Sequence, residues 1–388
     1  MVDVTIWSMP PGRAPYAEVT VGPNRLALLK DGFQAFPAMR AAIAEARRSI
    51  CLESYIILDD ATGLSFLEAL SERARAGVEV LLMYDDWGSE LSEPTLSRLA
   101  ASGVKVHAYH PVRWSPKVGR VLARLRRRNH RKSLVVDGEV GFLGGLNLSD
   151  EYAAREDGGA GWRDTHVRVV GPGALQLERL FLETWRGSRG PRFRAEPFHR
   201  GPEAPCGRLA IVGNHLGKDK KDIRRAYAQA FRRAARSVFL THAYFLPPNR
   251  LLRDLLEAAR RGARVAVIIA ATTDVKAVLY AARGLYPRLL KAGIEVYEWN
   301  TGRVLHAKTA VCDGQWATVG SSNLDPLSLR QNLEVNVTVE DATFAGALER
   351  LFLEDLRGCV RIDRDTVQSW DAFSRLLGWL AFRLRRWL

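Results

Sequence analysis

Apolar runs and helical stretches alternate along this chain of 388 residues. The runs at 78–84 and 265–270 consist almost entirely of apolar side chains, which is typical of strands that are covered on both faces. Helical stretches separate these runs from one another. The alternation predicts an α/β fold in which layers of helices cover the sheets.

The order of these elements occurs twice. ARRSICLES at 46–54 resembles AARSVFLTH at 234–242, and LERLFLETW at 177–185 resembles LERLFLEDL at 348–356. An internal repeat of this length is a better guide to the fold than local propensity. We therefore predict two pseudo-symmetric α-β-α sandwich halves. The expected boundaries are 1–185 for the first half, 186–208 for a linker rich in Pro, Gly and Arg, 209–360 for the second half and 361–388 for a basic tail.

A short polar motif also occurs twice. HRKSLVVD begins at His130 and HAKTAVCD begins at His306, and both read His-x-Lys-x4-Asp. In each copy an Asn follows 17 residues after the His, and these residues are Asn147 and Asn323. Agreement at so many polar positions makes chance implausible. We expect the fold to bring the two sets together on one anionic group.

The residue types of the motif suit phosphoryl transfer. Near neutral pH one imidazole can attack a phosphodiester while the other protonates the leaving oxygen. Lys132 and Lys308 lie two residues beyond the histidines, so on a strand they share a face with them and can neutralise phosphate oxygens. Asn147 and Asn323 can donate hydrogen bonds to the same oxygens. This chemistry needs no metal, the sequence contains no pattern of metal ligands, and no cofactor is expected.

Four acidic residues accompany the motifs. Asp137 and Asp313 complete the two copies and are included with their catalytic residues. Each lies five residues beyond the motif lysine, so on a regular strand its side chain points to the opposite face, and each precedes a glycine. A turn or an ion pair that fixes the motif is therefore favoured for them over direct chemistry. Asp164 and Glu334 follow the motifs at the start of similar alternating strands. Either residue can orient a catalytic imidazole by accepting its proton, as the third member of a triad does.

The charge balance indicates an anionic partner. Lys and Arg total 57 against 43 acidic residues, which gives a formal net charge of +14. Nucleic acid or an acidic lipid surface would suit this excess, and a solvated basic surface would also account for it. The basic segment at 112–129 precedes the first motif and is interpreted either as a lip that touches phosphates or as a solvated helix.

The C-terminal segment 373–388 favours a lipid surface. It has arginines but no acidic residue, and a helical wheel places most of its apolar side chains on one face. Its length of about 24 Å as a helix is too short to cross a bilayer, so we expect it to lie in anionic headgroups. The alternative is a terminal helix that docks on the protein body. No apolar run reaches the roughly 18 residues of a membrane span, and no signal peptide is expected.

The doubled motif, followed by GGLN at 144–147 and GSSN at 320–323, resembles the phospholipase D superfamily. The sequences around Asp164 and Glu334, GWRDTHVRVVGP and QNLEVNV, are similar to those of bacterial cardiolipin synthases. ESYI at 53–56 fits the same family. Because no N-terminal transmembrane segment is recognised, the chain resembles the shorter, peripheral type.

This resemblance implies a phospholipase D-type fold with one active site shared by the two halves, so a monomer is sufficient for one complete site. The implied reaction transfers the phosphatidyl group of one phosphatidylglycerol to a His with loss of glycerol, after which a second phosphatidylglycerol accepts it and cardiolipin forms. The usual order in the family makes His130 the nucleophile and His306 the acid that later becomes the base. The implied partner is an anionic membrane of phosphatidylglycerol and cardiolipin, met at the cytoplasmic face of the cell membrane by a peripheral protein, and no nucleic acid is expected.

Other functions stay open at this point. Relatives that carry the same motif include phospholipase D-type hydrolases and phosphodiesterases that act on nucleic acid, and the positive charge permits either activity. A non-catalytic lipid-binding protein is a further alternative, which two intact motifs argue against.

Overall fold

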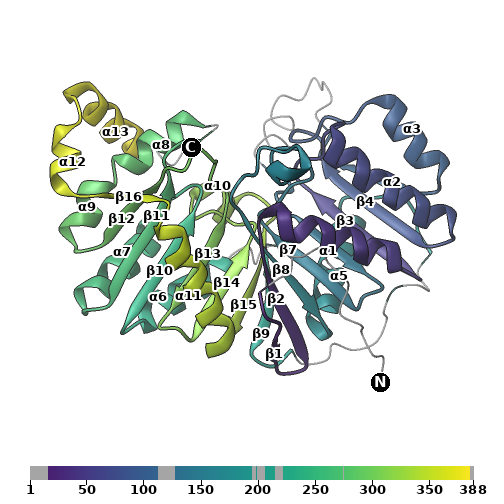
Figure 1. The fold of residues 1–388 in the computed structure, drawn as a ribbon, viewed down its shortest axis with the longest axis horizontal. Coiled ribbons are helices and arrows are strands. Elements are labelled where there is room, and N and C mark those ends of the chain that lie inside the picture. Colours follow the sequence, from purple (N-terminus) through teal and green to yellow (C-terminus); the bar gives the residue numbers. More distant parts are fainter. Residues whose placement is uncertain are drawn as a thin grey trace.

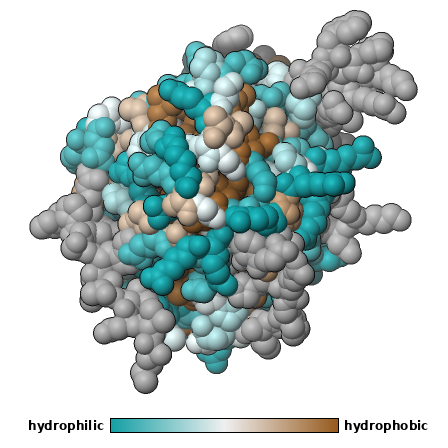
Figure 2. All heavy atoms as spheres, turned by 90° about the vertical axis from the view of Figure 1, so that its right-hand side faces the viewer, coloured by the Kyte–Doolittle hydropathy of each residue, from teal (hydrophilic) through white to brown (hydrophobic). Residues whose placement is uncertain are grey.

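Two halves whose sheets share an order of seven strands make up the protein (Figure 1). The computed structural model describes residues 16–111, 127–194, 198, 206–214, 222–273 and 275–384. Most of the basic segment predicted at 112–129, much of the linker and the last residues of the tail lie outside these ranges. Figure 2 views the first half from its outer side, where hydrophilic side chains cover much of the described surface around smaller hydrophobic patches.

The first half contains one mixed sheet of eight strands in the order β1-β2-β8-β7-β6-β3-β4-β5. Its strands are β1 (Val19–Val21), β2 (Asn24–Lys30), β3 (Ser49–Ser54), β4 (Glu79–Asp85), β5 (Lys105–Tyr109), β6 (Ser133–Val136), β7 (Val140–Gly144) and β8 (Thr165–Val170). Its helices are α1 (Asp31–Glu45), α2 (Ala61–Arg75), α3 (Glu93–Ala101), the short 3₁₀ helix η1 (Arg155–Asp157) and α5 (Pro172–Gly187). Strands β3, β4 and β5 run parallel, and the other pairs are antiparallel.

The second half contains a sheet in the order β16-β12-β11-β10-β13-β14-β15-β9. Its strands are β9 (Leu209–Gly213), β10 (Ser237–His242), β11 (Arg264–Ala270), β12 (Glu295–Trp299), β13 (Lys308–Cys312), β14 (Trp316–Gly320), β15 (Val335–Glu340) and β16 (Cys359–Ile362). Its helices are α6 (Asp222–Arg233), α7 (Asn249–Arg260), α8 (Lys276–Arg283), α9 (Tyr286–Lys291), α10 (Pro326–Arg330), α11 (Ala342–Leu356), α12 (Arg364–Ser369) and α13 (Ala372–Leu384).

The two sheets repeat one topology. The order β8-β7-β6-β3-β4-β5 in the first sheet corresponds to β15-β14-β13-β10-β11-β12 in the second, and β2 and β9 occupy equivalent places beside β8 and β15. The fully buried pattern of β4 and the nearly buried pattern of β11 agree with the apolar runs in the sequence. The predicted fold class of two pseudo-symmetric α/β halves is therefore confirmed.

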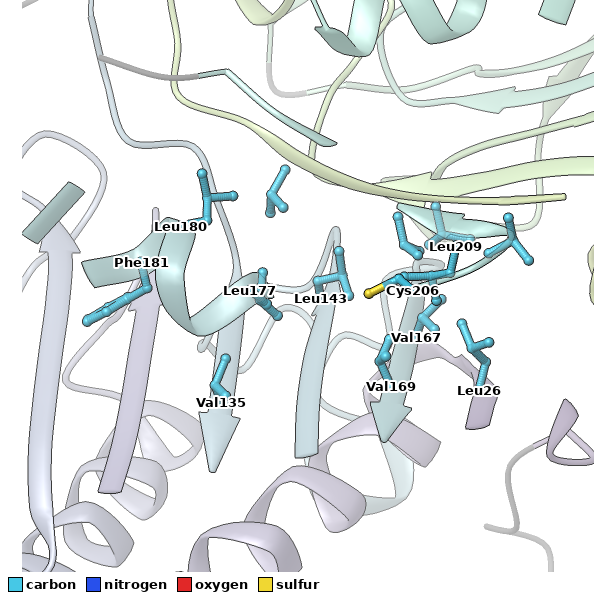
Figure 3. Close-up of a cluster of buried hydrophobic side chains, with 14 of the residues drawn as sticks. Leu26, Val135, Leu143, Val167, Val169, Leu177, Leu180, Phe181, Cys206 and Leu209 are labelled. Atoms are coloured by element: carbon cyan, nitrogen blue, oxygen red, sulfur yellow. The ribbon is translucent and has the colours of Figure 1, made fainter. Parts of the chain in front are cut away.

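One hydrophobic core joins the halves. Strands β7 and β8 lie against β14 and β15, and helices α5 and α11 contribute apolar side chains to the same cluster. Figure 3 shows part of this core, with Leu143, Leu177 and Leu180 between the strands of the first half and those of the second. The outer face of each sheet is covered by its own helices, α1 to α3 in the first half and α6 to α9 in the second. Because the central core belongs to both halves, their relative position is fixed by burial of apolar surface.

The described part of the tail is docked on the protein body. Helix α13 lies against α8, where Gly378 approaches Gly284 so closely that a Cβ on Gly284 would meet the Gly378 carbonyl oxygen at 2.2 Å. Ala381 and Phe382 pack against the core of the second half. The alternative of a docked terminal helix therefore applies to the described part of α13. No helix in the described ranges is both long and apolar enough to span a membrane.

Candidate active site

The two motif histidines lie at the junction of the halves. His130 precedes β6 and His306 precedes β13, which are equivalent strands of the two sheets. The His130 amide donates to the Leu333 carbonyl oxygen at 2.9 Å, and the His306 amide donates to the Arg163 carbonyl oxygen at 2.8 Å. Each motif is therefore held by backbone hydrogen bonds to the opposite half of the chain.

Each imidazole contacts an acid from the opposite half. His130 Nδ1 lies 3.0 Å from Glu334 Oε1, and His306 Nδ1 lies 2.7 Å from Asp164 Oδ2. Both carboxylates are fully buried. This crossed pairing fixes both rings through Nδ1, which is the arrangement that orients an imidazole in a catalytic triad. The structure thus places both predicted orienting acids on the histidines and shows which acid serves which ring.

The motif lysines are buried beside the histidines. Lys132 Nζ donates to the His130 carbonyl oxygen at 2.8 Å, and Lys308 Nζ donates to the His306 carbonyl oxygen. Lys308 begins β13 and Lys132 directly precedes β6, so the spacing of two residues places each lysine on the side of its own histidine. The site thus concentrates positive charge where an anionic phosphate would lie.

Burial controls the protonation of the site. The pKa of His130 lies well below its usual value because the ring is buried and because Lys132 and Lys308 are positively charged. Burial raises the pKa of Glu334 to about 8, although the nearby positive charge of Lys132 acts to lower it. Burial likewise raises the pKa of Asp164, although the charge of Lys308 acts to lower it. Burial also lowers the pKa of Lys132 well below its usual value. The lowered pKa of His130 favours the neutral imidazole, which is the form that acts as a nucleophile.

The two predicted asparagines differ in their surroundings. Asn147 Oδ1 accepts from the Ile56 amide at 3.1 Å, and its Nδ2 donates to Tyr152 Oη at 2.7 Å. Asn323 is also buried, but its Oδ1 has no hydrogen-bond partner within the described part of the chain. Asn147 is therefore engaged in holding its own half together, whereas no such hydrogen bond engages Oδ1 of Asn323 within the described residues.

Asp137 and Asp313 lie away from the imidazoles, and their grouping with the catalytic residues must be corrected. Strand β6 separates Asp137 from His130, and β13 separates Asp313 from His306. Their carboxylates accept from backbone amides in the turns before β3 and β10, those of Arg47, Arg48 and Ser49 for Asp137 and those of Ala235, Arg236 and Ser237 for Asp313. Both residues also have positive φ angles, 54° and 55°. They fix the turn that follows the motif, as their spacing from the motif lysines favoured.

The chain is similar in sequence to known proteins over most of its length. A family model described as "Cardiolipin synthase, PLD-like domain" matches residues 39–170 and 227–356. The chain belongs to the cardiolipin synthase family. A curated protein named cardiolipin synthase B from Escherichia coli K12 is 37% identical over 353 residues, which cover 89% of this chain and 83% of the relative. A cardiolipin synthase of Geobacillus kaustophilus is 35% identical over 350 residues, covering 89% of this chain and 69% of that protein.

Solved structures agree on the fold. A phosphatidylserine synthase from Haemophilus influenzae superposes with a TM-score of 0.69 at 12% identity and covers 96% of this chain and 97% of its own. A polyphosphate kinase from Porphyromonas gingivalis reaches a TM-score of 0.58 at 16% identity, covering 88% of this chain and 49% of its own. The predicted family and enzyme class, a phosphatidyltransferase of phospholipase D type, are thereby confirmed.

Aromatic side chains flank both imidazoles. The sequence did not predict these contacts. The Tyr55 ring lies 4.8 Å from that of His130, and the Tyr152 and Trp162 rings lie 5.3 and 5.9 Å from that of His306, centroid to centroid. All three belong to the first half. The repeat gave no signal for them, because the corresponding positions of the second half are Ala243, Ser328 and Asn332.

Buried ion pairs support the strands that carry the site. Arg128, two residues before His130, binds Asp85 through Nε and Nη2 at 2.8 and 2.6 Å. Arg163, the neighbour of Asp164, binds Asp355 of the second half at 2.6 Å. Such pairs are difficult to recognise in a sequence because their members lie far apart in the chain. Removing Arg128 or Arg163 would leave the buried carboxylate of Asp85 or Asp355 without its arginine partner.

Proposed function

We propose that this protein joins two phosphatidylglycerol molecules into one cardiolipin and releases glycerol. The observation that carries the proposal is the crossed pairing of two imidazoles with two buried acids, His130 with Glu334 and His306 with Asp164. The pairing supplies two oriented rings around one site, as a two-step transfer requires. The relatives that are 35 to 37% identical and named cardiolipin synthase support cardiolipin as the product.

In the first step, Nε2 of His130 attacks the phosphorus of one phosphatidylglycerol. The bond between phosphorus and the glycerol oxygen breaks, and protonated His306 gives its proton to that oxygen. The products are glycerol and a phosphatidyl group bound to His130. Lys132 and Lys308 stabilise the charge on the phosphate oxygens as the transition state forms, and Asn323 donates a further hydrogen bond.

In the second step, neutral His306 removes a proton from the terminal hydroxyl of a second phosphatidylglycerol. The hydroxyl oxygen attacks the same phosphorus, and the phosphorus–nitrogen bond to His130 breaks. Cardiolipin leaves, and both histidines return to their starting protonation states. The lowered pKa of His130 supports its assignment as the nucleophile.

Membrane contact belongs to the same proposal. Trp379 and Leu380 on α13 are 50% and 43% exposed, and the exposed Arg375 and Arg383 lie on the same helix. Trp87, in the loop that follows β4, is 60% exposed. Exposed aromatic side chains next to arginines suit the headgroup region of an anionic bilayer. We infer that the protein binds peripherally to the cytoplasmic face of the cell membrane, with phosphatidylglycerol and cardiolipin as its lipid partners and with one chain sufficient for catalysis.

Mass spectrometry after incubation with phosphatidylglycerol alone tests the reaction. We expect cardiolipin and glycerol in equal amounts, and neither product from His130→Ala. Phosphatidic acid in place of cardiolipin would identify a hydrolase of phospholipase D type. Absence of any lipid product, together with cleavage of single-stranded DNA, would identify a nucleic-acid phosphodiesterase and overturn the proposal.

Flotation with phosphatidylglycerol vesicles tests the membrane contact. Trp379→Ser combined with Leu380→Ser should weaken vesicle binding, whereas turnover of a short-chain soluble substrate should stay unchanged. Leu353→Ser is a suitable control, because Leu353 on α11 is also 43% exposed but lies on a different surface. Equal losses on vesicles and on the soluble substrate, with a lower melting temperature, would show that α13 serves only to complete the protein body.

A further inference from the structure

Four arginines surround a pocket whose lining does not include the catalytic histidines. Its volume is about 410 Å³. The arginines are Arg224 on α6, Arg250 and Arg253 on α7, and Arg330 on α10; Pro248, Asn249 and Pro326 complete the lining. The pocket therefore lies where the N-terminal parts of α6 and α7 meet α10.

The positive charge of this pocket is not compensated within the described ranges. None of the four guanidinium groups forms an ion pair with a described carboxylate, whereas the neighbouring Arg225 binds Asp222 at 3.1 Å. Burial and the positive charges of Arg330 and Arg250 lower the pKa of Arg224, so these groups are close enough to repel one another. Guanidinium groups gathered in this way are typical of a binding site for a phosphate, which they hold through paired hydrogen bonds.

The start of α7 adds to the charge imbalance. The helix has no acidic residue in its first turn and no side-chain cap, and Arg250 lies in that turn. A cation at this end opposes the helix dipole, so Arg250 lowers the stability of the helix unless an anion is bound. A residue that served only to stabilise the fold would not be expected here.

The equivalent place in the first half is built differently. By the alignment of the repeats, Asp60 and Asp150 of the first half correspond to Pro248 and Pro326. Asp60 caps α2 and accepts from the Asp150 amide at 2.7 Å, while Asp150 accepts from the Thr62 amide at 2.8 Å. The first half thus closes this position with its own acids. The second half has arginines and an open pocket instead, so the pocket is not a requirement of the fold.

The pocket lies at the catalytic edge of the second sheet. Pro326 follows Asn323 by three residues, and Arg330 precedes Leu333, whose carbonyl oxygen accepts from the His130 amide. On the other side, the bridge between Phe245 and Leu324 ties the segment before α7 to the segment before α10. A group bound among the arginines would therefore lie on the same edge as the reacting phosphate.

We propose that this arginine pocket binds the phosphate of a second anionic phospholipid, one whose phosphorus is not attacked. The proposal rests on the proposed function, since a reaction between two phosphatidylglycerol molecules always brings a second phosphate to the site. That phosphate belongs either to the acceptor lipid or to a neighbouring lipid of the bilayer. The chemistry of recognition is the same in both cases, and the assay separates them.

The test compares Arg250→Gln/Arg330→Gln with the control Arg260→Gln/Arg357→Gln, which removes the same charge from exposed arginines outside the pocket. Short-chain phosphatidylglycerol below its micelle concentration serves as donor, and the acceptor is either the same lipid or ethanol. If the acceptor phosphate binds here, KM for the lipid acceptor rises about tenfold in the pocket variant, while transfer to ethanol changes less than twofold. If a bilayer lipid binds here, both soluble reactions are unchanged, and binding to phosphatidylglycerol vesicles weakens about tenfold relative to the control.

Other outcomes overturn the proposal. Equal losses with ethanol and with the lipid acceptor would place these arginines in the general support of catalysis. Behaviour identical to that of the control in all three assays would leave the pocket without a ligand. The melting temperature of the pocket variant should not fall, because Arg250 opposes the helix dipole, and a fall of several degrees would indicate a structural role. Failure of the proposed function itself is distinguishable, because the unmodified protein would then make no cardiolipin.

Discussion

The two halves supply the same catalytic side chains but surround them differently. Each provides a His, a Lys and an Asn, and each provides the acid for the other half's imidazole. In the first half the acid is Asp164, and Gly145 is the residue that lies against it. In the second half the acid is Glu334, and Ser321, which corresponds to Gly145, donates a hydrogen bond to it. Tyr55, Tyr152 and Trp162, whose rings flank the imidazoles, all come from the first half.

Both halves are needed for one complete site. Crossed pairing makes neither half complete alone, so the site exists only when the central core has brought the sheets together. The different surroundings of the two rings give them different electrostatic environments, and a reaction with one nucleophile and one acid needs such a difference.

Removal of the imidazoles should have the largest effect. His130→Ala and His306→Ala are each expected to reduce transfer by roughly 10³-fold or more, because both rings act on the reacting atoms. A p-nitrophenyl phosphodiester has a leaving group that needs no proton, so it should restore the first step in His306→Ala but not in His130→Ala. The release of p-nitrophenol measures that step. Rescue of His130→Ala alone would reverse the roles, and rescue of neither would argue against divided roles.

Loss of Asp164 or Glu334 should affect the reaction in the same way as loss of the histidine that each acid contacts. Asp164→Asn and Glu334→Gln are each expected to lower kcat by about 10²- to 10⁴-fold, since each removes the carboxylate that orients a ring. The good leaving group should rescue Asp164→Asn, which affects His306, and should not rescue Glu334→Gln. Asp325→Asn is a matched control, because Asp325 is a buried acid that caps α10. The opposite pattern of rescue would contradict the pairing seen in the structure.

Substitution of Gly145 and Ser321, which lie next to Asp164 and Glu334, tests the difference between the two halves. A Cβ at Gly145 would lie 2.2 Å from Asp164 Oδ1, so Gly145→Ser should displace the carboxylate and lower kcat by about 10²-fold. Ser321→Gly removes one hydrogen bond to Glu334 and leaves space, so a loss of about tenfold is expected. Steady-state kinetics of the two variants measure the difference. A larger loss in Ser321→Gly would show that the hydrogen bond matters more than the space beside Asp164.

The motif aspartates should affect stability more than activity. Asp137→Ala and Asp313→Ala each leave backbone amides without their acceptor, so we expect a loss of about 1–3 kcal/mol in the free energy of unfolding with kcat nearly unchanged. Asn in place of either Asp should be milder, since it retains an acceptor oxygen and tolerates a positive φ. Urea unfolding and kinetics at one temperature measure both quantities. A catalytic loss without a stability loss would return these residues to the reacting group.

Chelation should have the smallest effect. Lys132 and Lys308 occupy equivalent places in the two halves and supply the positive charge for the phosphate oxygens. Activity should therefore be the same with and without excess EDTA, measured on short-chain lipid to avoid effects of metal ions on vesicles. Loss of activity on chelation, with recovery on adding one metal, would contradict a mechanism based on these lysines.

Much of the fold could be predicted because the sequence repeats its own pattern. The duplicated order of apolar runs predicted two sheets with one topology, and the spacing of two residues from His130 to Lys132 predicted side chains on one side of a strand. These features depend on local periodicity, which is written directly in the order of residues. The odd spacing from Lys132 to Asp137 likewise predicted that the Asp137 side chain points away from the reacting residues.

Tertiary structure alone decided how the halves meet. No local pattern states that Glu334 contacts His130 and that Asp164 contacts His306, because the crossing depends on how β7 and β8 pack on β14 and β15. The contact between α13 and α8 was also not predictable from a helical wheel, because a wheel ranks side chains by hydrophobicity, whereas Gly378 and Gly284 meet through the close approach of two backbones. Periodicity along one chain segment determines which face of an element is buried, but contacts between distant segments depend on shape and packing that only the folded core defines.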